Sequence, residues 1–224
     1  MIHAFLDESG THVGAQVLAV AGFYGSGNQW RKFRNIWKPF SKGFHAKNSS
    51  SRFPRICDAI EKSKINGVVI CLGNRAYKNQ ANPQVQSKVG NAYGAATLLC
   101  ATDICDETKP RRVSFSIEQG QPNVDFVRSV LEGLRVEKHL AIAEVATVGK
   151  EDFIELHTAD FASHIVSCYE PEWAQRLINS QRLAVKILPE RAIAQASVEV
   201  KKWINQARAI RRALSRDRQQ HNTQ

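Results

Sequence analysis

Short stretches of alternating or continuous apolar residues predict strands at five places along the chain. Residues 2–7 alternate and residues 16–24 form a longer apolar run, so we expect the two to pair as a hairpin across the Gly10–Gly14 loop. Three later stretches are also predicted to be strands: residues 68–72, 113–118 and 140–148.

Helical spacing separates these strands. Trp30, Phe33 and Trp37 predict a helix over residues 30–40 that stops at Pro39. Further helices are predicted at residues 52–64, 84–105, 123–134 and 152–169, and a long basic helix ends the chain. Strands that alternate with helices after an initial hairpin favour an α/β fold, with a mixed sheet flanked by helices.

The domain organisation follows from length and composition. With 224 residues and 43% hydrophobic content, the chain can bury one full core, which we place in residues 1–188. The basic helix at 189–218 is expected to pack on this domain or extend from it, and the tail at 219–224 to be disordered.

Composition also indicates the compartment. The most apolar stretch, residues 15–23, is far shorter than the roughly 20 residues of a membrane span, and the start lacks the pattern of a secretory signal. The five cysteines are scattered, without a CxxC pair, which is typical of reduced thiols. We therefore expect a cytoplasmic protein with no membrane partner.

The charge points to a polyanionic partner. Lys and Arg number 31 against 21 Asp and Glu, a net charge of +10, so nucleic acid is the first expectation and an anionic membrane surface the second. Much of the excess lies in the last helix, where we expect nucleic-acid contacts from Lys201, Lys202, Arg208, Arg211 and Arg212. A solvated helix face or the arm of a homodimer remains an alternative for this segment.

Two strands are predicted to end in acidic residues, Asp7 and Glu118. If these strands are parallel neighbours, the carboxylates lie at the same edge of the sheet, and the two anions repel unless a cation lies between them. A metal site is therefore expected there. Because successive strand residues face opposite sides, Glu8 is kept as an auxiliary that joins Asp7 only if the strand ends between them.

The stretch FIELHTADFASHIV, residues 153–166, offers a third acid. On a helix His157, Asp160 and His164 fall within about 60° of one another, beside an apolar stripe. Glu155 with Asp152 matches a capping box instead. His157 and Asp160 could also be a buried hydrogen-bonded pair, and His164 is expected to contact core or solvent more than metal.

Three motifs resemble a known family: D-E-S-G at 7–10, F-H-A at 44–46 and L-H-T-A-D at 156–160. Over residues 1–169 the chain resembles the domain of unknown function 3800, whose members look like RNase H-like folds of the integrase and RuvC nuclease superfamily. The resemblance implies a central first strand carrying Asp7, a second acid at Glu118 and a third at Asp160.

The same resemblance gives histidines a role. RuvC-like nucleases can use a histidine one turn before the last acid, where His157 stands, and His45 matches the histidine of the family's H-A motif as a substrate contact or proton carrier. The chain departs from the family pattern at two positions, because the family often has glutamine at the place of His157 and aspartate at the place of Glu118.

Carboxylate ligands favour Mg²⁺ or Mn²⁺, and two such ions suit hydrolysis of a phosphodiester. Asp7 would bridge the ions, Glu118 and Asp160 would each complete one, and His157 would orient or deprotonate the attacking water. The predicted function is a metal-dependent nuclease acting on DNA or RNA. Two alternatives stay open: a catalytically inactive module that binds nucleic acid or a protein partner, and a metal-dependent hydrolase of small phosphate esters.

Overall fold

Six strands form one mixed sheet at the centre of the protein, here a computed structural model. The structure describes residues 1–10, 17–73, 92–120, 124–136, 140–168 and 170–189, and four single residues, Val198, Lys202, Asn205 and Ala209. The strands are β1 (Ile2–Ser9), β2 (Val17–Ser26), β3 (Asn66–Gly73), β4 (Val113–Glu118), β5 (Ile142–Val148) and β6 (Leu183–Ile187).

The strand order is β5-β4-β1-β2-β3-β6, which places β1 inside the sheet. β1, β2 and β3 form an antiparallel meander, β4 pairs parallel with β1 and β5 parallel with β4, while β6 pairs parallel with β3. Alternate residues of β1 enter different cores, since Ala4 and Leu6 pack in one and Phe5 in the other. A strand that is buried on both faces accounts for its nearly continuous apolar sequence.

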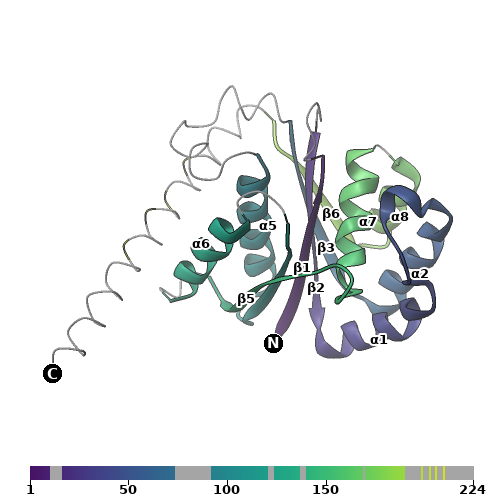
Figure 1. Cartoon of the computed structure of the whole chain (residues 1–224), viewed down its shortest axis with the longest axis horizontal. Coiled ribbons are helices and arrows are strands. Elements are labelled where there is room, and N and C mark those ends of the chain that lie inside the picture. Colours follow the sequence, from purple (N-terminus) through teal and green to yellow (C-terminus); the bar gives the residue numbers. More distant parts are fainter. Residues whose placement is uncertain are drawn as a thin grey trace.

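Helices cover both faces of the sheet (Figure 1). One face carries α5 (Ala92–Thr108) and α6 (Val124–Val136). The other carries α1 (Gly27–Trp37), α2 (Phe53–Ser63), α7 (Leu156–Ser167) and α8 (Pro171–Asn179). Three short 3-10 turns lie between α1 and α2: Lys38–Phe40, Ala46–Asn48 and Ser50–Arg52.

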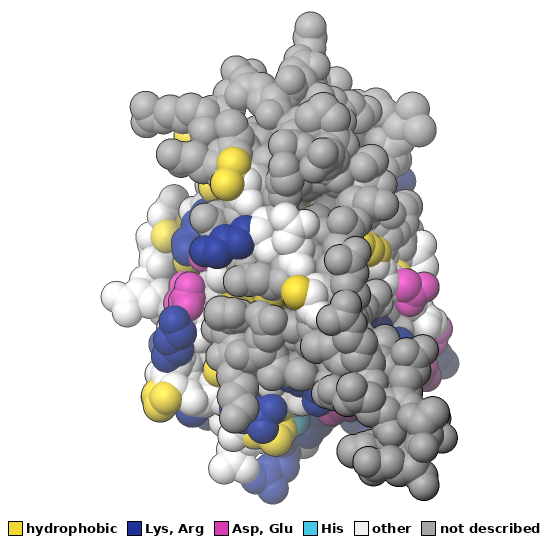
Figure 2. All heavy atoms as spheres, turned by 90° about the vertical axis from the view of Figure 1, so that its left-hand side faces the viewer, with side chains coloured by type: hydrophobic (Ala, Val, Ile, Leu, Met, Phe, Trp, Pro, Cys, Tyr) yellow, Lys and Arg dark blue, Asp and Glu magenta, His cyan; other side chains and the backbone are white. Residues whose placement is uncertain are grey.

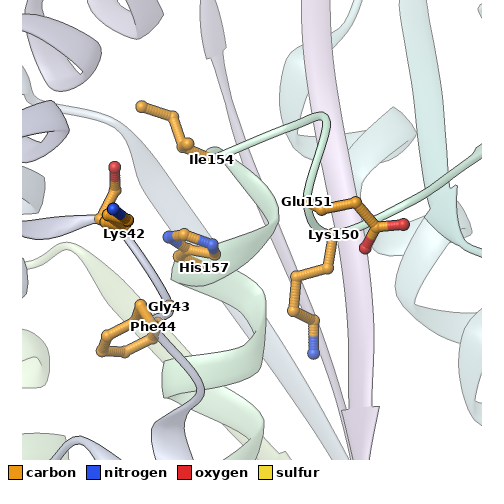
Figure 3. A pocket seen from close by; sticks show the side chains of 8 residues that line it. Lys42, Gly43, Phe44, Lys150, Glu151, Ile154 and His157 are labelled. Carbon is orange, nitrogen blue, oxygen red and sulfur yellow. The ribbon is translucent and has the colours of Figure 1, made fainter.

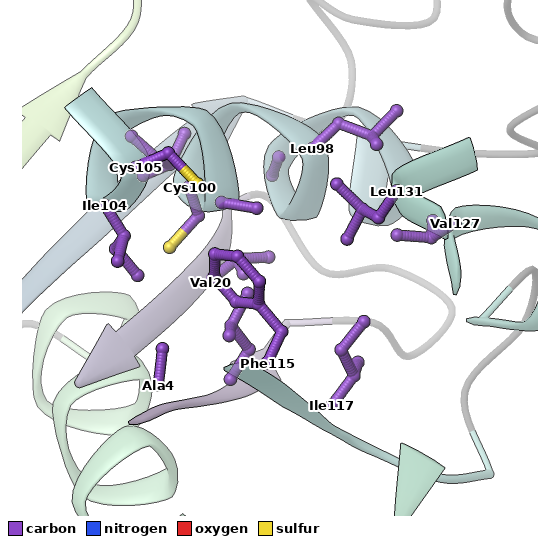
Figure 4. Close-up of a cluster of buried hydrophobic side chains, with 14 of the residues drawn as sticks. Ala4, Val20, Leu98, Cys100, Ile104, Cys105, Phe115, Ile117, Val127 and Leu131 are labelled. Atoms are coloured by element: carbon purple, nitrogen blue, oxygen red, sulfur yellow. The ribbon is translucent and has the colours of Figure 1, made fainter. Parts of the chain in front are cut away.

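The core beneath α5 and α6 is apolar and closely packed (Figure 4). Gly22 of β2 lets α5 approach, because a Cβ atom there would lie 2.6 Å from Ile104 Cδ1 and 2.9 Å from Cys100 Sγ. The opposite core contains buried aromatic side chains of α1 and α2, and the helix α7 beside it carries buried polar residues that include His157 and Asp160. Two of the predicted site residues, His157 and Asp160, therefore lie on the α7 side of the sheet.

The predicted α/β class, the hairpin and the helix-flanked mixed sheet are confirmed. The strand predicted at 68–72 is β3, which extends the hairpin into a meander. Two details were wrong: α8 and β6 follow where no separate element was expected, and α7 begins at Leu156 instead of residue 152. The predicted capping box is absent, because the N-cap Glu155 makes no capping bond and its carboxylate pairs with Arg34.

Several predictions lie outside the described residues. These are most of the Gly10–Gly14 loop, the beginning of the helix expected at 84–105, the basic helix at 189–218 apart from isolated positions, and the tail at 219–224. Where the structure does describe the chain, its free cysteines comprise four buried residues and the exposed Cys168. None of the described helices combines the length and apolar content needed to cross a membrane.

Candidate metal centre

Asp7 and Glu118 meet at the carboxyl ends of two parallel neighbours, β1 and β4. The register pairs Leu6 with Ile117, so the next residue of each strand is the acidic one. α7 packs across β1 and β2 and brings Asp160 to the same edge. The three acids that the sequence selected from distant segments are therefore neighbours in space.

The side chain of Lys150 joins these three carboxylates. Its Nζ atom lies 2.8 Å from Asp7 Oδ2, 3.1 Å from Glu118 Oε1 and 3.3 Å from Asp160 Oδ1. Lys150 follows β5 in the turn before α7, and its side chain is only 17% exposed. One ammonium group thus stands at the point where the three acids converge.

Burial and charge shift the pKa values of this group. Burial, followed by a hydrogen bond to Glu118, raises the pKa of Asp7 well above its usual range, although Lys150 opposes the shift. Burial lowers the pKa of Lys150, but the neighbouring carboxylates outweigh it and the net shift is upward. The ammonium form of Lys150 is therefore favoured.

Glu8 belongs to the same cluster. β1 continues to Ser9, yet ligand atoms of Glu8, Asp7 and Glu118 lie within 4.8 Å of one another, so the expectation that Glu8 stays apart unless the strand ends was wrong. Glu8 is 8% exposed, and its Oε2 atom has no hydrogen-bond partner. Burial, then the charge of Glu118, raises its pKa to about 8.

The F-H-A segment holds Asp160 from the other side. The backbone N–H of Ala46 donates to Asp160 Oδ2 at 2.8 Å, and His45 Nδ1 lies 3.8 Å from the same oxygen. The other oxygen of Asp160 remains directed at Lys150. His45 is exposed, so it stands at the rim of the cluster and not within it.

His157 is neutral and already partly engaged. The Trp37 indole N–H donates to His157 Nδ1 at 3.0 Å, and burial lowers the pKa of this histidine to about 4. A neutral imidazole with an accepting Nδ1 carries its proton on Nε2. His157 can therefore donate a hydrogen bond, but it has no free ring nitrogen to remove a proton from water.

His164 and the terminal basic residues fall elsewhere. His164 contacts the Phe53 ring, and its Nδ1 lies 3.5 Å from Cys168 Sγ, one turn beyond Asp160. Lys202 is described as an exposed helical residue. The other terminal residues expected to bind nucleic acid lie outside the described part: Lys201, Arg208, Arg211 and Arg212.

A pocket of about 390 Å³ adjoins the cluster. Figure 3 shows Lys150 and Glu151 on one side, Lys42 and Phe44 on the other, and His157 between them. The pocket connects the acids, through Lys150, with the segment between α1 and α2.

Sequence reasoning missed Lys150 and the charge of the α1–α2 region. For the first, the available signal was a lysine two residues after the end of β5, the strand that pairs with β4 and its terminal Glu118. For the second, residues 31–64 contain ten basic and two acidic residues, a denser excess than that of the terminal helix.

Twelve chains among the solved structures match the protein. The ribonuclease H2 from Pyrococcus horikoshii OT3 matches with a TM-score of 0.53 and 10% identity, over 81% of this chain and 78% of that one. The Bst-RNase HIII in complex with Mn²⁺ matches with a TM-score of 0.52 and 17% identity, over 94% and 70%. The fold is RNase H-like.

A third RNase H-like neighbour is the RNase HII in the PCNA complex from Archaeoglobus fulgidus. Its TM-score is 0.50 at 15% identity, and the match covers 93% of this chain and 91% of that one. No protein-family model and no curated protein sequence matches the chain. The fold implied by the sequence motifs is thus confirmed, and the narrower family stays a prediction.

Proposed function

We propose that the protein is a divalent-metal-dependent nuclease of RNase H-like type that hydrolyses phosphodiester bonds in nucleic acid. The observation that carries the proposal is the convergence of Asp7, Glu118 and Asp160 on one cation position, which the Lys150 ammonium occupies. Membership of the domain of unknown function 3800 family is part of the same proposal.

The donor set suits hard divalent ions. All the candidate ligands are carboxylate oxygens, the kind that Mg²⁺ and Mn²⁺ prefer. The ammonium of Lys150 stands in for one cation, and the partnerless Oε2 of buried Glu8 marks an acceptor that this cation leaves unsatisfied. Mn²⁺ in the structure of the Bst-RNase HIII neighbour supports the choice of ion, and we propose two ions here.

When bound, such ions activate water and stabilise the leaving oxygen of an in-line phosphodiester displacement. Asp7, on the central strand, would hold both ions, while Glu118 and Asp160 would each complete one, with Glu8 as a further ligand. His157 would orient water or a phosphate oxygen through its Nε2–H, which replaces the proton-accepting role expected from sequence. His45 would contact the substrate from the rim.

A basic rim beside the cluster supports nucleic acid as the substrate. We use "basic rim" for five residues of the α1–α2 region: Lys38, Lys42, Lys47, Arg52 and Arg55. The Arg52 guanidinium donates to the carbonyls of Phe40, at 3.2 Å, and Lys42, at 2.8 Å, which fixes the loop. Lys42 lines the pocket with Lys150, so the rim leads to the acids.

The opposite side of the molecule has a different charge pattern. Figure 2 shows basic and acidic side chains interspersed over the described part of the surface on the α5–α6 side. Because phosphate contacts come from clustered Lys and Arg, the rim is the better candidate for backbone binding. Contacts from the terminal helix, through Lys201 and its neighbours, remain a prediction.

The test of the chemistry uses purified protein with Mn²⁺ or Mg²⁺ and labelled DNA, RNA and RNA–DNA hybrid substrates. Wild type should cut at least one of them, EDTA should stop the reaction, and Asp7→Asn and Asp160→Asn should each abolish it. Equal cleavage by the wild type and both variants would show that the activity comes from elsewhere.

The test of the rim measures binding in EDTA, where no cleavage occurs. Lys42→Glu combined with Lys47→Glu should weaken binding and flatten its dependence on salt by about one phosphate contact per lysine lost. Arg111→Glu is the matched control, because Arg111 is exposed just before β4, at the opposite end of the sheet. Salt-sensitive binding without any cleavage would favour an inactive module. If the protein hydrolyses small phosphate esters, and the Lys42→Glu and Lys47→Glu substitutions leave that rate unchanged, the alternative of a small-ester hydrolase is favoured.

A further inference from the structure

We propose that Lys150 is a resident cation of the metal centre: its ammonium compensates the acids while no divalent ion is bound, and it moves into the adjoining pocket when one binds. The inference rests on the proposed function for the identity of the ions. It assigns Lys150 a role that the sequence motifs did not indicate.

The contacts of Lys150 are those of a cation at a ligand site. Three carboxylate oxygens, from β1, β4 and α7, lie within 3.3 Å of its Nζ atom. A divalent ion held by the same oxygens would meet the ammonium at close range, and like charges at that distance repel. The two cations therefore compete for one position.

The balance of charge favours replacement of the ammonium. Four acidic side chains gather at the cluster, Asp7, Glu8, Glu118 and Asp160, against the single charge of Lys150. One ammonium cannot satisfy them all, since the Oε2 atom of buried Glu8 has no hydrogen-bond partner. A divalent ion brings twice the charge and accepts several oxygen ligands at once.

Lys150 can leave without disturbing the sheet. It lies in the turn after β5, and its charge sits at the end of a flexible four-carbon chain. The pocket of about 390 Å³ that it lines provides room on the side of Lys42 and His157 (Figure 3). There the ammonium would face the same space as Lys42 and the Nε2–H of His157, in position to contact a substrate phosphate.

The primary test measures Mn²⁺ binding in the absence of nucleic acid. Titration calorimetry and the electron paramagnetic resonance signal of free Mn²⁺ both report the affinity. Lys150→Met keeps the length of the side chain and removes the competing positive charge, so it should bind Mn²⁺ at least about tenfold more tightly than wild type. Lys186→Met is the matched control: Lys186 pairs with Asp103 at 2.8 Å, away from the acids of the cluster, so this variant should bind Mn²⁺ as the wild type does.

A second measurement uses the wild-type protein and does not depend on how the variant folds. Acetylation of lysines, mapped by mass spectrometry, should modify Lys150 slowly in EDTA and several-fold faster with Mg²⁺, while Lys186 reacts equally in both. The proposal would be overturned if Lys150→Met bound Mn²⁺ no more tightly than the wild type. It would also be overturned if the acetylation rate of Lys150 were the same in EDTA and in Mg²⁺. Tighter Mn²⁺ binding in a protein that cuts no nucleic acid would refute the proposed function and leave the role of Lys150 supported.

Discussion

Two clusters of acids around a basic residue differ in what they leave unsatisfied. In the surface cluster Arg176 of α8 binds Glu61 through two hydrogen bonds, of 3.0 and 2.6 Å, and Asp58 at 2.5 Å. In the buried cluster Lys150 meets three carboxylates, with Glu8 nearby. The Arg176 side chain is 33% exposed, whereas the Asp7 side chain is fully buried.

This difference distinguishes a structural ion pair from a candidate metal site, where the acids lack enough positive charge. Arg176 presents a planar fork that matches its partners, and water reaches the cluster, so its acids are satisfied as they stand. The buried acids share one point charge, and the pKa values of Asp7 and Glu8 rise because burial and the neighbouring carboxylates outweigh it. A structural cluster needs nothing more, while the buried one gains from every additional cation.

The largest effect is expected when one carboxylate in each cluster is replaced with an amide. Glu118→Gln should lower cleavage by more than about 100-fold, since it removes an electrostatic contribution to the transition state. Glu61→Gln should leave cleavage as in the wild type and lower the free energy of unfolding by about 1 kcal/mol, because it weakens a partly exposed ion pair. Cleavage rates and urea unfolding of both variants measure these effects. A comparable loss of activity in Glu118→Gln and Glu61→Gln would contradict the division into a functional and a structural cluster.

A smaller effect is expected in the pH dependence of stability without metal. The pKa of Glu8 is about 8 in the folded protein against an ordinary value of 4.5. A group whose folded pKa is raised stabilises the fold below its unfolded pKa, and this contribution is lost as the pH rises through the folded value. In EDTA the free energy of unfolding should therefore fall between about pH 5 and pH 8, by a few kcal/mol at most.

Divalent ions should reverse this loss, because they stabilise the ionised carboxylates. Glu8→Gln is the control, since it should flatten the slope in EDTA. Thermal unfolding across this pH range, with EDTA and with Mg²⁺, measures both effects. A stability that rises toward pH 8 in EDTA would contradict the assignment of a raised pKa to the buried acids.

The smallest effect is expected at His157. Glutamine can accept the Trp37 N–H and still donate a hydrogen bond, so His157→Gln should lower kcat by less than about tenfold, whereas loss of a general base costs about 10² to 10⁴. The pH profile of kcat/KM should keep its shape, because the histidine pKa of about 4 lies below the working range. If the kcat/KM profile of His157→Gln instead loses the acid limb that the wild type shows, His157 acts as a proton acceptor after all.

Sequence periodicity predicted the sheet well where strands are buried and bounded by polar residues. The strand at 113–118 was placed with its observed bounds, and its parallel pairing with β1, the condition for bringing Asp7 and Glu118 together, is present. β6 was missed although residues 183–188 are largely apolar, because the run is short and directly precedes the segment expected to be the basic helix.

At the site, the sequence indicated the acids but not the groups that act on them. The motifs selected Asp7 and Asp160 because their neighbours form recognisable patterns. Lys150 sits in a turn with no periodicity, and only the assembled sheet brings it to the acids. The orientation of Glu8 also depends on how a long side chain bends round a strand end, which alternation alone does not describe.

The central position of β1 restricts how this protein can change over evolutionary time. Odd and even residues of the strand meet different helices, and its last residues carry the acids. Deleting a single residue of β1 would move the residues after it to the opposite face of the sheet. Side chains from one core would then point into the other, and Asp7 would point away from α7. Insertions and deletions can accumulate in the surrounding loops, whereas β1 tolerates only substitutions.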